Sequence, residues 1–234
     1  MRLLIKFNPL CNEKYDNIGK YDIQGFIYSL LKDTEFHDYH NIHGFKYFTF
    51  SNIFPVCDYK LGEQKQLIIS SPSSAFIKLL HYNLSHMEVF RLNRYFMEIK
   101  SLKLLNIKSS MFIIGGTPIV LYENNIENRY YSFKSSPNFN FFFERLKDNA
   151  LKKYNSYYND DYYFEGELFD SFEFNREVSV RMKIHDNNFI VIGSLWKSLE
   201  KELTKDNRKF NNFIFDCGLG EKNSLGFGFV NNRR

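Results

Sequence analysis

Cysteine is scarce in this sequence, and the few cysteines lie far apart. The 234 residues include three, Cys11, Cys57 and Cys217, which are separated by 46 and 160 positions. An odd count at these distances excludes a disulfide framework and lacks the close spacing of a zinc knuckle. We therefore expect three reduced thiols.

Long hydrophobic runs are also missing. The longest apolar stretch, near residues 111–121, is broken by Gly115, Gly116 and Pro118, and it is shorter than the ~18 residues that suggest a membrane span. Lys6 and Pro9 interrupt the apolar N-terminal segment, where the core of a signal peptide would lie. We expect a cytoplasmic protein without a membrane segment.

The sequence lacks a strong charge excess, because 31 Lys and Arg oppose 27 Asp and Glu for a formal charge of +4. All of this excess falls in residues 1–110, with 14 basic against 10 acidic side chains, whereas residues 111–234 hold 17 of each. The densest basic part of residues 1–110 contains Arg91, Arg94, Lys100, Lys103 and Lys108. Both an anionic partner and a solvated strand face fit this distribution.

The apolar content of 44% is sufficient for a packed core. Hydrophobic periodicity in the first half predicts strand, helix, strand, strand, helix and strand in that order. These elements are expected at residues 2–8, 21–32, 46–54, 66–70, 74–85 and 88–105, with the turn Ser71-Pro72-Ser73 capping the second helix. This order is typical of a ferredoxin-like domain.

The second half shows a similar pattern. Strands are expected at 111–122, 178–184, 189–192, 213–215 and 227–230, and helices at 140–154 and from Gly193 to residue 203. We therefore predict an α+β fold of tandem ferredoxin-like (RRM-like, βαββαβ) domains packed side by side. Their predicted ranges are 1–110 and 111–234, and the second includes a glycine-rich loop at 218–228.

That loop combines glycines with small polar and basic residues, namely Gly218, Gly220, Lys222, Asn223, Ser224, Gly226 and Gly228. It is not a Walker loop, because Phe227 follows Gly226 where a lysine is needed. It does not match the dinucleotide fingerprint either, and the six residues after Gly228 leave no room for a phosphate-binding helix. The remaining interpretations are a turn that contacts a phosphodiester backbone and a turn whose glycines only relieve strain.

Three of the six histidines, His37, His40 and His43, are spaced three residues apart. They could face one side of a helix as metal ligands. The aromatic run at 45–50 instead indicates a segment that leaves a helix for a strand, and no fourth ligand has matching spacing. We expect no metal site, and we consider acid–base chemistry, because histidine titrates near neutrality.

RNA cleavage by its own 2′-hydroxyl requires three groups. One deprotonates the hydroxyl, one protonates the departing 5′-oxygen, and a cation stabilises the phosphorane. His40, Tyr28 and Lys46 could supply them, with Tyr28 on the preceding helix. Solvated histidines without a chemical role remain the alternative from spacing alone.

Three segments together resemble a known family. They are Gly-Leu-Gly-Glu-Lys-Asn-Ser-Leu-Gly-Phe-Gly at 218–228, the histidine-containing segment 40–51, and residues 24–28 on the first helix. The first is similar to the glycine-rich signature of the repeat-associated (RAMP) superfamily. The second resembles the catalytic-histidine segment of the CRISPR-associated endoribonucleases that process repeat transcripts, the sixth of the numbered Cas families.

The resemblance implies cleavage within the repeat of precursor CRISPR RNA, without a metal or other cofactor, leaving a 2′,3′-cyclic phosphate and a 5′-hydroxyl. By position it implies that His40 is the main acid–base residue, Lys46 the phosphorane stabiliser and Tyr28 the third member. His37 or His43 could share the role of His40, because catalytic residues vary within the family. It also implies that the loop supports the fold and holds RNA through Gly218, Gly220, Lys222, Asn223, Ser224, Gly226 and Gly228.

The same glycine-rich loop occurs in superfamily subunits that bind RNA without cutting it. The alternative function is therefore a non-catalytic guide-RNA-binding subunit of a CRISPR interference complex, and a scaffold without RNA contact is a third. The expected partners are CRISPR repeat RNA and subunits of such a complex, with the chain as a monomer or homodimer.

Overall fold

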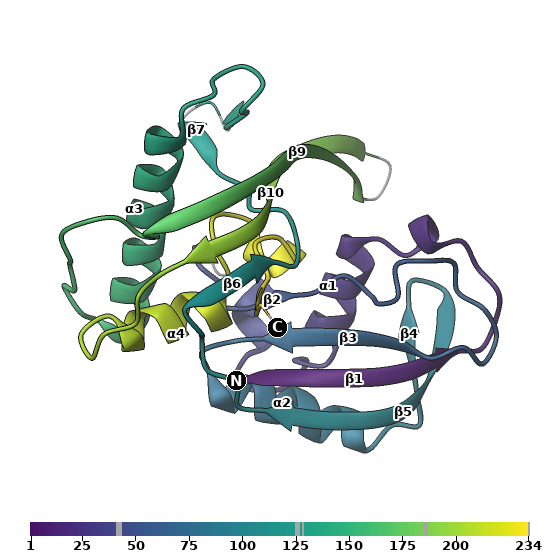
Figure 1. Cartoon of the computed structure of the whole chain (residues 1–234). Coiled ribbons are helices and arrows are strands. Elements are labelled where there is room, and N and C mark those ends of the chain that lie inside the picture. The colour runs from purple at the N-terminus through teal and green to yellow at the C-terminus, as the bar shows by residue number, and fades with distance from the viewer. Residues whose placement is uncertain (41–43, 125–126, 128, 185–186, 234) are drawn as a thin grey trace.

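The computed structural model contains two antiparallel sheets that lie side by side, each accompanied by two helices (Figure 1). It describes residues 1–40, 44–124, 127, 129–184 and 187–233, without the side chains of Tyr39, His40 and Ile184. Within this described part of the chain, no helix is long and apolar enough to cross a membrane.

The first sheet has the strand order β2-β3-β1-β5-β4, with every pair antiparallel. Its strands are β1 (Arg2–Pro9), β2 (Thr49–Phe50), β3 (Lys65–Ser70), β4 (Val89–Leu92) and β5 (Tyr95–Leu105). Its helices are α1 (Lys20–Ser29) and α2 (Ser74–Ser85), and two short 3-10 turns are η1 (Tyr15–Asn17) and η2 (His37–His40). Apart from the edge strand β4, this is the order of a ferredoxin-like domain.

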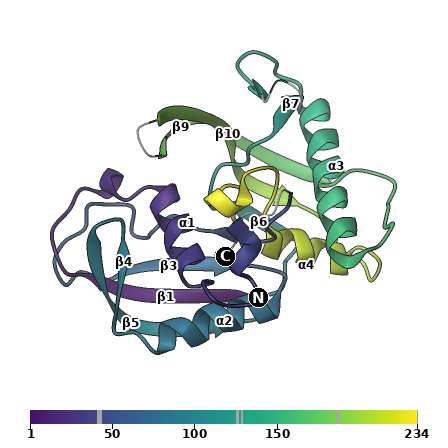
Figure 2. The ribbon, with the colours of Figure 1, turned by 180° about the vertical axis from the view of Figure 1, so that it is seen from behind.

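Strand alternation and helix capping explain how this unit forms. Leu3, Ile5 and Phe7 of β1 are completely buried, as expected where alternate residues face the core. The side chain of Ser73 accepts a hydrogen bond of 3.2 Å from the backbone N–H of Phe76, which caps α2 at its predicted start. Seen from behind, α1 and α2 cover the same face of the sheet (Figure 2). One hydrophobic core therefore lies between that face and the two helices.

The second sheet has the order β11-β6-β10-β9 and is also antiparallel. Its elements are β6 (Phe112–Gly115), α3 (Phe139–Tyr158), β9 (Ser171–Ile184), β10 (Asn187–Glu200), α4 (Arg208–Cys217) and β11 (Val230–Asn232). A two-stranded ribbon, β7 (Tyr122–Asn124) and β8 (Arg129–Tyr130), lies between β6 and α3 in the chain. The strand order confirms the predicted tandem ferredoxin-like fold. The exact boundary after residue 110 stays a prediction.

The helix predicted from Gly193 is wrong, because β10 continues through this position to Glu200. A Cβ at Gly193 would lie 2.9 Å from the carbonyl oxygen of Ile119. The glycine therefore permits the close approach of a neighbouring segment, which forms a bridge between Ile119 and Ser194. A glycine that serves close packing was interpreted as the start of a helix.

Three other predicted elements differ from the structure. The strand expected at 213–215 is part of α4, whose buried residues Phe210, Phe213, Ile214 and Cys217 follow helical spacing. The single strand expected at 88–105 is the hairpin of β4 and β5, which turns at Asn93 with a φ of 55°. The predicted strand at 46–54 is reduced to the two residues of β2.

The side chain of Arg2 joins the two units. This residue of β1 is completely buried, and its guanidinium donates hydrogen bonds to the backbone oxygens of Phe215 and Val230, each at 2.9 Å. It also donates to Asn231 Oδ1 at 2.7 Å and lies 3.8 Å from the centre of the Phe215 ring. A buried charge with this many acceptors holds β1 against the C-terminal segment.

Candidate functional site

The glycine-rich loop at 218–228 lies between the two units. It leaves α4, passes through a short 3-10 turn, η3 (Asn223–Leu225), and enters β11. The hydroxyl of Thr49 on β2 donates to the carbonyl oxygen of Phe227 at 3.0 Å. Gly226 has a φ of 75°, and a Cβ there would overlap the ring of Phe50. The loop therefore needs glycine at Gly226 both for its backbone conformation and for its contact with the first unit.

A buried lysine on α3 holds the loop from the side of the second unit. The ammonium of Lys153 donates to the carbonyl oxygens of Gly218 and Gly220 at 2.8 and 3.0 Å, and to Asn223 Oδ1 at 2.9 Å. Burial lowers the pKa of Lys153, and the three oxygen acceptors compensate for the lost water. Sequence reasoning missed this lysine, although a polar residue at buried helical spacing beside Leu146 and Ala150 was the available signal.

Asn223 takes part in the same network. Its side-chain amide donates to the carbonyl oxygens of Leu219 and Phe227 at 2.9 and 3.0 Å, while its Oδ1 accepts from Lys153. Both polar atoms therefore form bonds within the second unit. The prediction that Asn223 contacts RNA stays untested, and the structure adds a loop-forming role.

One face of α1 meets the loop from the first unit. Lys20, Gln24 and Tyr28 are spaced four residues apart and therefore lie on the same side of the helix. The Lys20 ammonium donates to the carbonyl oxygen of Gly226 at 2.7 Å, and Gln24 Nε2 donates to that of Ser224 at 3.0 Å. Tyr28 forms a side-chain hydrogen bond with Ser224. The structure thus brings the predicted catalytic Tyr28 against a predicted loop residue.

Tyr28 is half-buried at the end of α1. Its ring meets that of Phe48 edge-on, with centroids 6.0 Å apart. Burial raises the pKa of its phenol, and the hydrogen bond with Ser224 opposes this shift. The hydroxyl therefore has an environment set by both units.

Lys46 lies two residues before Phe48, whose ring contacts that of Tyr28. Partial burial lowers the pKa of its ammonium. The next residue, Tyr47, is fixed by both units, because Ser71 Oγ donates to its carbonyl oxygen at 2.7 Å and its own hydroxyl donates to Ser156 Oγ of α3 at 2.8 Å. The backbone that carries Lys46 is therefore well positioned.

The histidine segment is described only in part. His37 is exposed, and its Nδ1 accepts from the backbone N–H of Asp33 at 3.3 Å. The backbone of His40 ends η2, whereas its side chain and all of His43 lie outside the described residues. The described part contains no cluster of three or more His, Cys, Asp or Glu that could hold a metal ion.

Lys222 projects toward the β7–β8 ribbon. Its ammonium lies 5.7 and 5.8 Å from the ring centres of Tyr122 and Tyr130, which stack on each other at 5.1 Å. It also forms a hydrogen bond with Tyr130. This placement combines a cation and aromatic rings beside the loop, a combination that suits nucleic acid.

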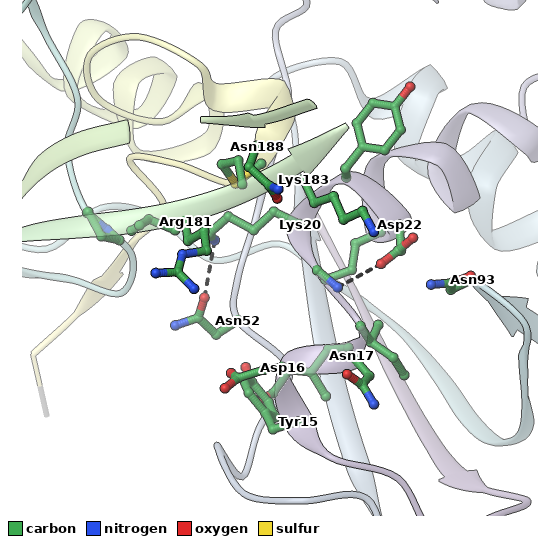
Figure 3. A pocket seen from close by; sticks show the side chains of 18 of the residues that line it. Tyr15, Asp16, Asn17, Lys20, Asp22, Asn52, Asn93, Arg181, Lys183 and Asn188 are labelled. Carbon is green, nitrogen blue, oxygen red and sulfur yellow. Dashed lines mark hydrogen bonds between the residues drawn. The ribbon is translucent and has the colours of Figure 1, made fainter. Parts of the chain in front are cut away.

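An open cleft of about 1140 Å³ lies between the start of α1 and the β9–β10 hairpin (Figure 3). Its charged lining residues are Asp16, Lys20, Asp22, Arg94, Arg181 and Lys183. The carboxylate of Asp22 accepts a bond of 2.7 Å from the backbone N–H of Gly19, so its charge serves the first turn of α1. The cleft was not predicted as a set of residues, because its two walls are more than 150 positions apart in sequence.

Burial lowers the pKa of one cation of the cleft, the ammonium of Lys20. Lys20 Nζ is packed 5.1 Å from the ring centre of Phe227 and 5.7 Å from that of Phe50, and burial lowers its pKa to about 7. It also donates to Asn52 Oδ1 at 3.2 Å (Figure 3). Lys20 therefore connects the floor of the cleft with the loop.

Comparison with known proteins agrees with this arrangement. The family described as CRISPR associated protein Cas6, C-terminal, matches residues 100–232. The chain is 44% identical to CRISPR-associated endoribonuclease Cas6 2 of Methanocaldococcus jannaschii, over 99% of both chains. It is 29% identical to CRISPR-associated endoribonuclease Cas6 1 of the same organism, over 82% of this chain and 76% of the other.

Solved structures lead to the same family. One described as CRISPR associated protein Cas6 superposes with a TM-score of 0.73 and 25% identity, covering 100% of this chain and 99% of the other. Together with the family match over more than half of the chain and the full-length curated relative, this shows that the chain belongs to the Cas6 family of CRISPR-associated proteins.

Proposed function

We propose that this chain is an endoribonuclease that cleaves precursor CRISPR RNA within its repeat. One observation carries the proposal: the glycine-rich loop of the second unit packs on α1 at Gln24 and Tyr28, and Lys20 of the same helix lines a partly basic cleft. We assign the three types of group needed for attack by a 2′-hydroxyl on its own phosphate to Tyr28, Lys46 and His40. The curated relatives named CRISPR-associated endoribonucleases support the substrate class.

The proposed reaction needs no metal. His40 acts as the main acid–base residue, Tyr28 as the partner in proton transfer, and the ammonium of Lys46 stabilises the extra negative charge of the phosphorane. The 2′-oxygen attacks phosphorus after losing its proton, and the 5′-oxygen leaves with a proton. The products carry a 2′,3′-cyclic phosphate and a 5′-hydroxyl.

The cleft between α1 and the β9–β10 hairpin offers a path for the RNA. Arg181 and Lys183 provide charge for the phosphates, and Tyr15, Asn52 and Asn188 provide groups that can stack on or hydrogen-bond with unpaired bases. We propose that Lys222 extends this contact along the loop. We propose that the domain of residues 1–110 carries the catalytic residues, and that the domain of residues 111–234 contributes the glycine-rich loop.

The test is a cleavage assay with end-labelled repeat RNA in excess EDTA. Beside it, the same RNA carries one 2′-deoxy substitution at each candidate position. We expect one cleavage site that a single deoxy substitution abolishes, and a loss of about 100-fold or more in His40→Ala with RNA binding retained. Tight binding without cleavage would contradict the proposal and favour a guide-RNA-binding subunit. Full activity of His40→Ala would reject only the acid–base role of His40.

A further inference from the structure

The contact between α1 and the glycine-rich loop converges on one side chain. Of the three α1 residues that reach the loop, two contact Ser224. Gln24 Nε2 lies 3.0 Å from the Ser224 carbonyl oxygen and 3.3 Å from Ser224 Oγ, and Tyr28 bonds with the Ser224 side chain. A serine of the second unit therefore lies between two side chains that are one helical turn apart in the first.

The chemistry of these groups limits the direction of the hydrogen bonds. The amide nitrogen of Gln24 can only donate, so Ser224 Oγ accepts in that contact and keeps its own proton for a second partner. Donation of that proton to the phenol oxygen is the direction in which the bond lowers the pKa of Tyr28, and the O–H bond of Tyr28 then points away from Ser224. The result is a relay from Gln24 through Ser224 to Tyr28.

The loop itself also holds Ser224 in place. Ser224 is the middle residue of η3, which lies between Lys222 and Gly226, both in the left-handed backbone region with φ of 57° and 75°. The preceding Asn223 is bonded on both polar atoms, including to buried Lys153. A hydroxyl supported in this way can fix the orientation of a neighbouring group before substrate binds.

We propose that Ser224 is a positioning residue for Tyr28: its hydroxyl, itself oriented by Gln24, sets the direction of the Tyr28 hydroxyl for proton transfer. This inference rests on the catalytic role given to Tyr28 above. It assigns to the glycine-rich loop a part in the chemistry, through one side chain, in addition to its packing role. Tyr28 of the first unit then depends on Ser224 of the second unit for its orientation.

The experiment measures single-turnover cleavage of repeat RNA with protein in excess, as a function of pH. The variants are Ser224→Ala, Ser224→Thr, Gln24→Ala, Tyr28→Phe and the double variant of Ser224→Ala with Tyr28→Phe. Ser135→Ala is the matched control, because this exposed serine of the second unit donates only to the carbonyl oxygen of Ser132. Affinity is measured separately with uncleavable 2′-deoxy RNA.

We expect Ser224→Ala to lower the saturated cleavage rate about tenfold, as for the loss of one orienting hydrogen bond, with RNA affinity unchanged. The pH limb that reports the phenol should move to higher pH, because a donor to its oxygen is lost. Ser224→Thr should restore the rate within about threefold, because threonine keeps the hydroxyl. Gln24→Ala should give a smaller loss in the same direction, and Ser135→Ala none.

The double variant decides whether Ser224 acts through Tyr28. In the Tyr28→Phe background, Ser224→Ala should cause no further loss, because the group it orients is absent. A full additional loss there, a wild-type rate for Ser224→Ala, or a defect confined to RNA affinity would overturn the inference. If Tyr28→Phe itself cleaves as fast as wild type, the proposed role of Tyr28 fails instead.

Discussion

The two units share a strand order but differ in the connection between their second helix and their last strand. In the first unit, the chain after α2 forms β4 at the open edge of the sheet, with Val89 and Met87 exposed. In the second unit, the chain after α4 is the glycine-rich loop, which is buried between the units at all four of its glycines. Topologically equivalent connections therefore have opposite environments.

This difference explains where the candidate site forms. An exposed connection is free to accept large side chains, whereas the buried one must bring its backbone close to Phe50 and to the carbonyl oxygen of Leu219. Glycine at Gly226 and Gly228 makes that approach sterically possible. The site lies where the two units are forced into close contact.

Replacing Gly226 should give the largest effect, and a matched glycine exists in the first unit. Gly226 and Gly62 have nearly the same φ, 75° and 76°, but an added Cβ meets the Phe50 ring at Gly226 and nothing within 4 Å at Gly62. We expect Gly226→Ala to lower the free energy of unfolding by about 4 kcal/mol and Gly62→Ala by about 1 kcal/mol, measured by urea denaturation. Equal losses would show that backbone strain alone matters.

Lys153 offers the next largest effect, with its neighbour Lys152 as the control. Lys153→Met removes the donor to the Gly218 and Gly220 carbonyl oxygens, which then remain buried without that bond. We expect a loss of about 3 kcal/mol in the free energy of unfolding. Lys152 is exposed and paired with Asp148 at 2.8 Å, so Lys152→Met should change stability by less than about 0.5 kcal/mol. A silent Lys153→Met would mean that the loop does not depend on this anchor.

The architecture could be predicted from the sequence to a large extent, because it depends on local periodicity. The alternation in β9 and the capped helix after Ser73 lie where they were expected. The errors at α4 and at Gly193 arose where a short apolar run or a single glycine has two physical interpretations. Only the contacts of the folded chain distinguish them.

The candidate site was predictable in its residue types but not in its connections. Tyr28, Lys46 and the loop were chosen from their chemistry and from family resemblance, and their roles stay predictions. The bond between Tyr28 and Ser224 joins positions 196 residues apart and depends on how the two units pack. No local pattern encodes such a contact. Helical spacing could indicate that Lys153 is buried, but not that it bonds to the loop.

The contact of Lys20 with the glycine-rich loop can be tested by the pH dependence of the free energy of unfolding. Its pKa is lowered to about 7 in the folded protein, against about 10.4 in an unfolded chain. Between these values the unfolded state binds more protons, so the stability should rise with pH from about 7 to 10. Lys20→Met should remove this rise in stability, and the exposed-site variant Lys60→Met should retain it. Parallel stability curves for Lys20→Met and wild type would contradict the assignment.

The smallest expected effect concerns RNA affinity and compares the two connections directly. Lys222→Ala in the buried connection should weaken repeat binding about threefold and reduce the slope of log affinity against log salt by about one, because one phosphate contact is lost. Arg91→Ala, on exposed β4 of the first unit, should leave that slope unchanged. If both variants lower the slope equally, the RNA extends over both connections. If only Arg91→Ala does so, the cation beside Tyr122 and Tyr130 serves packing, and the RNA path lies on the first unit.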